Sequence, residues 1–317
     1  MADIPMEKLK TTFNTIHAEI EKVIIGQRDV VEQVLIGILC QANVLLESYP
    51  GLGKTLLVRT LSEVMDLKFT RIQCTPDLMP SDIIGTEVIE ESGGKRQFKF
   101  QQGPVFSNIL LADEINRATP KTQAALLEAM QEKQVTVANK TYKLDEPFFV
   151  LATQNPIEQE GTYPLPEAQT DRFLLKVKIG YPEYNDEVAI VQQYTRGEQT
   201  SGVRKILGKN SVIALQKFTR QVPIANDLIK YTVNIVNETR KNKQHIEFGA
   251  SPRASIGLVL AAKARAIMNG RAHVSEEDIK ALATPILRHR IILNFEAERQ
   301  GLSTDDVIQN ILKKVKA

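Results

Sequence analysis

The feature that most constrains this chain is a glycine-rich loop that joins an apolar run to a segment with helical spacing. Residues 44–46 are apolar, residues 48–55 read Ser-Tyr-Pro-Gly-Leu-Gly-Lys-Thr, and residues 56–61 are typical of a helix. This order predicts a buried strand, a tight turn and a helix N-terminus, where backbone N–H groups and the helix dipole favour an anion. We therefore expect a nucleotide-binding α/β fold organised around this loop.

Each residue type within the loop suits one part of a nucleoside triphosphate. Gly51 and Gly53 allow backbone N–H groups to surround phosphate oxygens, Lys54 would reach the β- and γ-phosphates, and the Thr55 hydroxyl can bind Mg²⁺. Ser48 stands where such loops usually begin with glycine, so the turn is kept only if the φ angle of Ser48 stays negative. The alternative is a surface turn that happens to end in Gly-Lys-Thr.

A second informative stretch, residues 108–114, is an apolar run that ends in two carboxylates. Strands buried on both faces belong to parallel sheets, and their carboxyl ends line the ligand crevice. Asp113 would hold Mg²⁺ through its water shell, and Glu114 would orient and deprotonate the water that attacks the γ-phosphate. The alternative is that both carboxylates cap the following helix. Residues 148–156 form another buried run, and Asn155 at its end could bind the γ-phosphate or the attacking water.

The rest of the first half alternates between helical and strand patterns. One β-hairpin is expected to turn at Asn139-Lys140, and alternation at residues 97–101 beside Gly93-Gly94 predicts another. Helices are expected at residues 6–22, 28–39 and 55–65, and five sheet strands at residues 43–47, 68–74, 108–114, 148–156 and 173–177.

Gly180-Tyr181-Pro182 ends this alternation, and the residues beyond it show helical spacing only. We predict two domains, an α/β core at residues 1–180 and an all-α domain at residues 181–317. In the second domain, Ser251 is expected to cap a helix that begins at Pro252, and Ser275 begins a further helix with a capping box.

Composition places the chain among ordinary globular proteins, with 43% hydrophobic and 25% charged residues in a total of 317. The longest apolar stretch, residues 34–46, is shorter than the roughly 20 residues that cross a bilayer. Residues 1–5 lack the pattern of a signal peptide, so we expect a cytoplasmic protein without a membrane segment. Cys40 and Cys74 lie in apolar contexts and are interpreted as reduced core residues.

Charge is divided unevenly along the chain. Residues 1–200 hold 20 Lys and Arg against 28 Asp and Glu, whereas residues 201–317 hold 20 against 10. The basic part could contact the acidic part of a neighbouring copy or a nucleic acid, or it could be a solvated surface without a partner. Because the basic residues are not interleaved with aromatic residues, nucleic acid is the less favoured partner.

Eight segments carry a resemblance to a known family: residues 24–27 (IIGQ), 51–55 (GLGKT), 78–85 (LMPSDIIG), 98–106 (FKFQQGPVF), 113–118 (DEINRA), 152–156 (ATQNP), 165–173 (LPEAQTDRF) and 251–254 (SPRA). Together they resemble AAA+ ATPases, and among them the MoxR group, over nearly the whole chain. The departures are Ser48 for glycine and Thr170 where the family often has an apolar residue. The resemblance implies an ATPase core followed by a helical lid, with ATP and Mg²⁺ as ligands.

The resemblance also implies roles for single residues. Asn155 matches the residue called sensor 1, and Arg253 matches sensor 2. Arg172 matches the arginine finger, which acts on the ATP of a neighbouring subunit in a ring, usually of six. A structural ion pair with Glu167 or Asp171 is the alternative for Arg172. The residues implied to contact the nucleotide are Ile25, Gly26, Gln27, Gly51, Leu52, Gly53, Lys54, Thr55, Leu56 and Pro182.

Three other classes of protein share part of this pattern. A small GTPase needs an Asn-Lys-x-Asp motif, and the candidate at residues 139–142 lacks the Asp. A nucleic-acid motor should carry a DNA-binding module, which the second half does not indicate, and a non-hydrolysing scaffold would be expected to lack Glu114 or Arg172. We therefore expect an ATP-hydrolysing homo-oligomeric ring that remodels or helps assemble protein complexes of unspecified identity. MoxR relatives are thought to do so with partners that contain a von Willebrand factor A domain.

Overall fold

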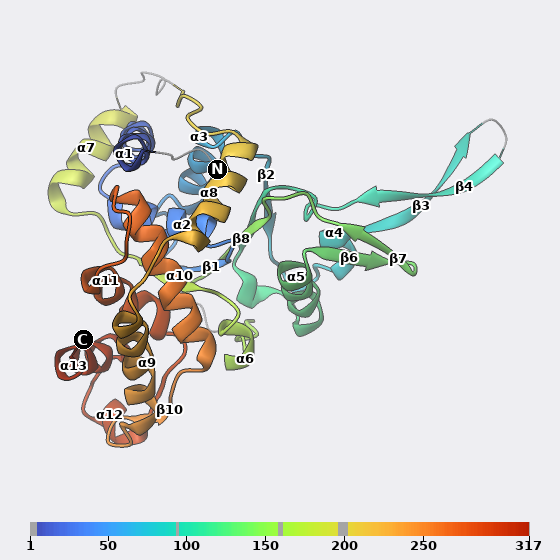
Figure 1. Cartoon of the computed structure of the whole chain (residues 1–317). Coiled ribbons are helices and arrows are strands. Elements are labelled where there is room, and N and C mark those ends of the chain that lie inside the picture. The colour runs from blue at the N-terminus through green and yellow to red at the C-terminus, as the bar shows by residue number, and fades with distance from the viewer. Residues whose placement is uncertain (1–4, 93–94, 158–160, 196–201, 317) are drawn as a thin grey trace.

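A five-stranded parallel sheet lies at the centre of the molecule (Figure 1). The structure, a computed structural model, describes residues 5–92, 95–157, 161–195 and 202–316. All four pairings in the sheet are parallel, which confirms the fold class predicted from the buried strand runs. In spatial order the strands are β2 (Phe69–Gln73), β5 (Ile109–Asp113), β8 (Phe149–Gln154), β1 (Val44–Ser48) and β9 (Leu175–Ile179).

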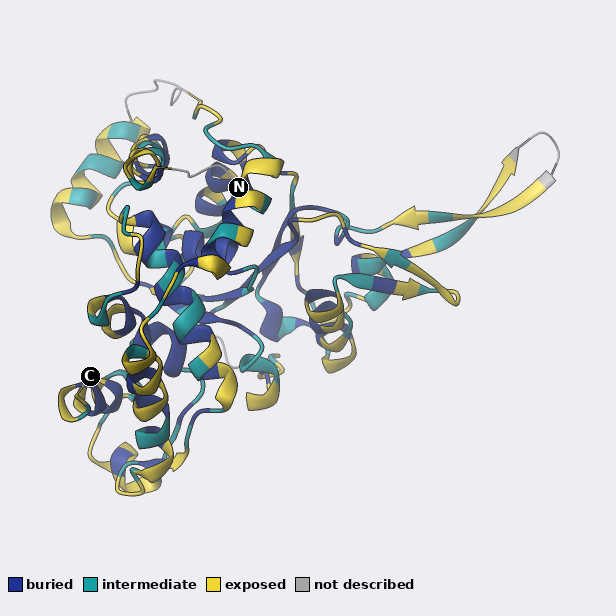
Figure 2. Cartoon of the chain, viewed as in Figure 1, coloured by how far each residue is buried: buried dark blue, intermediate teal, exposed yellow. Residues whose placement is uncertain are grey.

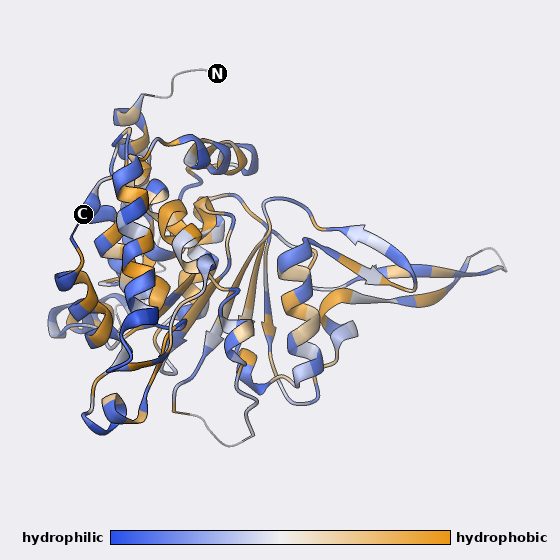
Figure 3. Cartoon of the chain, turned by 60° about the horizontal axis from the view of Figure 1, so that its bottom comes forward, coloured by the Kyte–Doolittle hydropathy of each residue, from blue (hydrophilic) through white to orange (hydrophobic). Residues whose placement is uncertain are grey.

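Helices cover both faces of the sheet (Figure 3), and its strand β5 is buried along its whole length. In β5, Ile109 and Leu111 join the hydrophobic cluster on one face, and Leu110 and Ala112 join the cluster on the other. The helices of the first half are α1 (Met6–Glu21), α2 (Arg28–Leu39), α3 (Lys54–Val64), α4 (Pro80–Ile84), the 3-10 turn η1 (Ile115–Arg117), α5 (Pro120–Glu132) and α6 (Glu167–Thr170).

Two β-hairpins project away from the C-terminal helices, and the longer one is mostly exposed (Figures 1 and 2). It pairs β3 (Gly85–Ser92) with β4 (Lys95–Gln102), which is longer than the strand predicted at 97–101, and its predicted turn residues lie outside the described part of the chain. The shorter hairpin pairs β6 (Gln134–Val137) with β7 (Lys140–Lys143). Its turn falls on Ala138 and Asn139, both with positive φ, so the predicted turn at Asn139-Lys140 was wrong by one residue.

The C-terminal part is helical, as predicted, apart from one short antiparallel pair. β10 (Ile246–Phe248) pairs with β11 (Ile292–Leu293), so the expectation of helices alone was wrong at these two segments. The packing of the helices between them brings these two segments together. The spacing of apolar residues along the chain does not show such a contact. The helices are α7 (Tyr184–Thr195), α8 (Lys209–Gln221), α9 (Asn226–Lys241), α10 (Pro252–Met268), α11 (Glu276–Leu287), α12 (Phe295–Arg299) and α13 (Thr304–Lys314).

One hydrophobic cluster runs through both halves of the chain. It contains Phe13 of α1 and Leu46 of β1 together with Leu258 of α10 and Ile286 of α11. The helical lid therefore packs directly on the face of the sheet that α1, α2 and α3 also cover. Within the described residues, no helix has the length and apolar character needed to span a bilayer.

Candidate nucleotide site

The glycine-rich loop leaves the end of β1 without strain at Ser48. Ser48 is the last residue of β1, pairs with Ile179 of β9 and donates its buried hydroxyl to the Tyr49 carbonyl at 2.9 Å. The left-handed backbone angles of the loop fall instead on Gly51 (φ 80°) and Gly53 (φ 75°). The condition set by the sequence, a negative φ at Ser48, is therefore met.

The phosphate-facing part of the loop has the backbone shape and the open space that an anion requires. A Cβ atom at Gly51 or Gly53 would meet nothing within 4 Å, so the glycines are needed for their φ angles rather than for close packing. α3 begins at Lys54, which places Lys54 and Thr55 in the first turn, where backbone N–H groups have no partner within the helix. These residues fit a bound triphosphate.

The segments predicted to border the adenine lie against the loop. Gln27 donates its side-chain amide to the Leu52 carbonyl at 3.2 Å. A Cβ on Gly26 would lie 2.1 Å from Asp186 Oδ2, so this segment touches the beginning of α7. The rings of Tyr49 and Tyr181 stack with centroids 5.3 Å apart, next to Pro182. The structure thus brings the loop, residues 25–27 and the end of β9 together on one side of the sheet.

Asp113 is buried at the carboxyl end of β5, and both of its carboxylate oxygens have partners. Thr153 of β8 donates its hydroxyl to Oδ1 at 2.6 Å, and Arg71 of β2 donates to Oδ2 at 2.7 and 3.1 Å. Carboxylate and hydroxyl oxygens suit Mg²⁺, so Asp113 and Thr55 have the right chemistry for this ion. Thr153 and Arg71 were missed in the sequence, although each is a polar residue on a predicted strand next to 108–114.

Glu114 has a backbone conformation that non-glycine residues seldom adopt, with φ 57° and ψ 51°. Its N–H donates to the Thr153 hydroxyl at 2.8 Å, and Oε2 accepts from Gln73 at 2.8 Å and from Arg117 at 3.2 Å. Residues held in this region cost about 1–3 kcal/mol and concentrate at functional sites. Neither carboxylate caps a helix, since the helix after Glu114 has no side-chain cap, so that alternative was wrong.

Two further residues complete the edge of the sheet. Asn155 is buried just after β8, between the ends of β5 and β1, and its Oδ1 accepts from the Ile157 N–H at 3.2 Å. Cys74 follows β2, and burial, reinforced by the negative charges of Asp113 and Glu114, raises its pKa to about 12. Cys40 is also a buried free thiol, so the interpretation of both cysteines as reduced core residues is confirmed.

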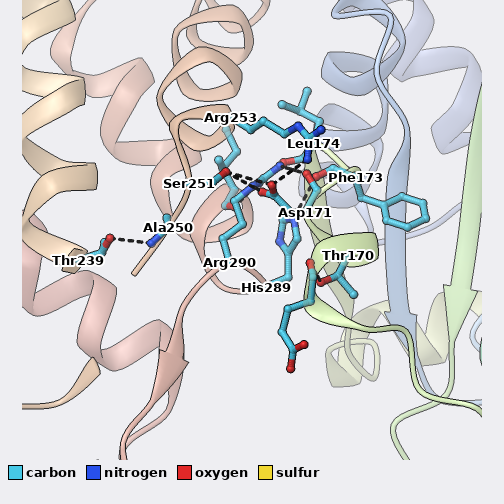
Figure 4. Close-up of polar contacts among 12 residues, drawn as sticks. Thr170, Asp171, Phe173, Leu174, Thr239, Ala250, Ser251, Arg253, His289 and Arg290 are labelled. Atoms are coloured by element: carbon cyan, nitrogen blue, oxygen red, sulfur yellow. Dashed lines mark hydrogen bonds and ion pairs between the residues drawn. The ribbon is translucent and has the colours of Figure 1, made fainter. Parts of the chain in front are cut away.

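Arg172 and Arg253 lie at the opposite end of the sheet from the loop. The Leu174 N–H donates to the Asn43 carbonyl at 2.8 Å, which places this segment beside the amino end of β1. Five residues of extended strand separate that end from the loop, a span of roughly 16 Å. Arg253 Nη1 donates to Asp171 Oδ2 at 3.2 Å (Figure 4). Arg172 and Arg253 line one cavity of about 160 Å³, together with Asp171 and Arg290.

The ion pair considered for Arg172 does not form. The Asp171 carboxylate is shared by Ser251, Arg253 and Arg290. Across the described ranges, the Arg172 guanidinium has no ion pair, and its Nε is buried without a hydrogen-bond partner. The structural alternative for Arg172 was therefore wrong, and its guanidinium remains available to a group from outside the chain.

Comparison with known proteins agrees with this architecture. Residues 43–175 match the family described as the ATPase family associated with various cellular activities (AAA), and residues 238–311 match the AAA lid domain. The fold and the loop thus define a P-loop protein of the AAA class.

Individual relatives narrow the class further. Chaperone MoxR1 from Mycobacterium tuberculosis is 43% identical over 94% of this chain and 80% of its own length. Protein MoxR from Paracoccus denitrificans is 31% identical, with 92% of each chain covered. A crystal structure of a candidate ATPase from Cytophaga hutchinsonii superposes with a TM-score of 0.91 at 46% identity, covering 98% of this chain and 96% of its own. The chain belongs to the MoxR group of AAA+ ATPases.

Proposed function

We propose that this chain binds ATP with Mg²⁺ at residues 48–55 and hydrolyses it in a ring, in which each copy completes the site of its neighbour. The observation that supports the proposal is that two sets of charged residues lie at opposite ends of the sheet. Lys54, Asp113 and Glu114 lie at the carboxyl end of the strands, whereas Arg172 and Arg253 lie beyond the amino end.

Within one copy, the residues at the carboxyl end divide the chemistry among them. The loop N–H groups and Lys54 hold the phosphates, and Asn155 positions the γ-phosphate or the attacking water. Thr55 and Asp113 hold Mg²⁺, which neutralises charge on the β- and γ-phosphate oxygens when it is bound. Glu114 accepts a proton from the attacking water, a role worth about 10²–10⁴-fold in rate.

Glu114 is restrained in the conformation described above. Its carboxylate accepts a hydrogen bond from Gln73 and forms an ion pair with Arg117. We infer that these contacts open when Glu114 acts as the base. The Thr153 hydroxyl holds the Glu114 backbone meanwhile, so that only the side chain needs to move.

The arginines at the amino end require a second copy. A span of roughly 16 Å exceeds the length of an arginine side chain, so neither Arg172 nor Arg253 can reach the loop of its own chain without a large rearrangement. Their cavity is lined by three arginines, Arg172, Arg253 and Arg290, and among its lining residues Asp171 is the one carboxylate. This excess of positive charge suits the γ-phosphate of a neighbour, and such fingers contribute roughly 10³–10⁵ in rate.

Head-to-tail contact places the amino end of the sheet in one copy against the carboxyl end of the sheet in the next. Such contacts form a closed ring when the rotation from copy to copy returns to the first copy. The acidic first part and basic second part of the chain favour that orientation. We propose that the ring, of about six copies by resemblance to AAA+ proteins, remodels or assembles protein complexes. The name of Chaperone MoxR1 supports a chaperone-like role, and a partner with a von Willebrand factor A domain is proposed from the MoxR resemblance.

The test mixes two inactive variants, Arg172→Ala and Lys54→Ala, at several ratios. If the arginine acts on the neighbour, some contacts pair an intact Arg172 with an intact loop, and phosphate release returns. Sedimentation must show mixed assemblies in the same samples. Assembled mixtures that stay inactive at every ratio would refute the arrangement between copies.

A further inference from the structure

Asp171 connects parts of the chain that are far apart in sequence. Its carboxylate accepts from Ser251 Oγ at 3.0 and 3.2 Å, from Arg253 Nη1 at 3.2 Å and from Arg290 Nε at 2.8 Å (Figure 4). Asp171 precedes β9, Ser251 and Arg253 begin α10, and Arg290 follows α11. We name these four residues the Asp171 cluster. The polar contacts of the Asp171 cluster connect the lid to the segment that carries Arg172.

Arg290 fixes one side of this cluster. Its side chain is 3% exposed, and it donates to the carbonyls of Asp171, Phe173 and Leu174 at 3.2, 2.6 and 2.9 Å and also to the Ile286 carbonyl. A buried guanidinium that donates hydrogen bonds to this many carbonyl oxygens is held in one orientation. The backbone around Arg172 is therefore tied to the lid on both sides of that residue.

A buried histidine adds a second tie to the same segment. His289 lies 3.0 Å through Nε2 from the Phe173 carbonyl. Burial, helped by the positive charge of Arg290, holds the pKa of His289 well below its usual value, so the ring is neutral and Nε2–H donates. The arginine-bearing segment is thus anchored through carbonyl groups rather than through the Arg172 side chain.

Ser251 behaves differently from an ordinary helix cap. It occupies the N-cap position of α10, as predicted, but its hydroxyl makes no capping bond and is directed to Asp171 instead. The beginning of α10, which carries Arg253 in its first turn, is therefore oriented by Asp171.

Arg253 is the loosely held member of the cluster. Its side chain is 57% exposed, and the one hydrogen bond that it makes among the described residues, to Asp171, is 3.2 Å long. The contact directs Arg253 into the cavity that Arg172 also lines, while leaving most of its guanidinium free to bind another group.

We propose that Asp171 is a positioning residue that holds Arg253 and Arg172 as one preorganised pair for the ATP of the neighbouring copy. This inference rests on the proposed function, because it requires that the pair acts between copies. Asp171 does so in two ways. Its carboxylate orients the first turn of α10, which carries Arg253, and it pairs with Arg290, which anchors the backbone on both sides of Arg172. Without that charge Arg253 and Arg290 repel one another and the arrangement opens.

The experiment uses the full chain with Asp171→Asn, which keeps the size of the side chain and removes its charge. Misplacement by about 1 Å can cost about 10²-fold in rate, so we expect kcat to fall about 10²-fold with ATP affinity of the variant's own loop unchanged. Glu167→Gln is the matched control. Glu167 is an exposed carboxylate on the adjacent α6, and we expect parental kcat.

Mixing separates positioning from a structural role. Asp171→Asn combined with Lys54→Ala should recover activity, because the intact arginine end of one chain serves the intact loop of the other. Asp171→Asn combined with Arg253→Ala should recover none, because both changes affect the same end. An unchanged kcat for Asp171→Asn, or a matching loss of its own ATP binding, would overturn the proposal.

The failure of this inference can be told apart from failure of the proposed function. If Arg172→Ala and Lys54→Ala complement each other but Asp171→Asn and Lys54→Ala do not, Asp171 has no role between copies while the ring mechanism stands. If Asp171→Asn does not fold, Ser251→Ala removes one hydrogen bond to the same carboxylate. We then expect a loss of about 5- to 10-fold in kcat, also recovered by mixing with Lys54→Ala, and no loss would overturn the proposal.

Discussion

Thr153→Val removes one hydroxyl that serves both carboxylates of the nucleotide site. The hydroxyl is fully buried, donates to Asp113 Oδ1 at 2.6 Å and accepts the Glu114 N–H at 2.8 Å. A hydrogen bond to a charged group is worth about 1.5–3 kcal/mol, and an unsatisfied buried donor costs about 1–3 kcal/mol. Since the two terms are not additive, we expect the free energy of unfolding to fall by about 2–4 kcal/mol.

The same change should reduce turnover, because the left-handed backbone at Glu114 depends on this hydrogen bond. If Glu114 relaxes, part of the roughly 10²–10⁴-fold contribution of a general base is lost, so we expect kcat to fall at least about 10-fold. Lys54 and the loop are untouched, and ATP affinity should change little.

The assays are urea unfolding monitored by circular dichroism and steady-state phosphate release. Thr153→Ser keeps the hydroxyl and should retain most of kcat, and Thr136→Val, at an exposed position of β6, should leave both measurements unchanged. A Thr153→Val protein with the parental urea midpoint and parental kcat would refute the role of this hydroxyl.

Three further outcomes are expected. Lys54→Ala should abolish nucleotide binding, whereas Glu114→Gln should bind ATP and lose turnover by about 10²–10⁴-fold. Near-normal phosphate release by Glu114→Gln would show that Glu114 is not the general base. ATP should drive self-association more than ADP does, and added salt should weaken it, since exposed charges are screened beyond about 8–10 Å; a monomer in sedimentation at all protein concentrations with ATP would contradict this. Hydrogen bonds from Lys22 and Arg204 lower the pKa of Glu19 from 4.5 to about 2, so its contribution to stability is complete above pH 4.5 and is lost as pH falls towards 2. The urea midpoints of Glu19→Gln and the parent should therefore differ at pH 7 and converge near pH 2, and a constant difference would count against the assignment.

The sequence predicted the sheet and its phosphate loop because both depend on local patterns. A buried run such as 109–113 and a loop with glycines at 51 and 53 restrict the backbone within a few residues. The position of Asp113 and Glu114 at the carboxyl end of a strand then follows from the rules of parallel sheets.

The contacts between distant segments could not be predicted in the same way. Nothing in the spacing of Ser251 or Arg253 shows that both meet Asp171, because that meeting depends on how α7, α8 and α9 return the chain to the amino end of the sheet. Thr153 was overlooked for a related reason. A threonine inside a strand is ordinary by propensity, and only the neighbouring β5 gives its hydroxyl two partners.

The hydrophobic cluster shared by the two halves has a consequence for movement. A lid that swung away from the sheet would expose apolar side chains such as Leu258 and Ile286, which are fully buried, at about 1.5–3 kcal/mol for each side chain. Arg290 would lose its carbonyl partners in the same step. Each copy is therefore expected to respond to nucleotide nearly as a rigid body, so that the work of hydrolysis is expressed as rotation of whole copies against one another.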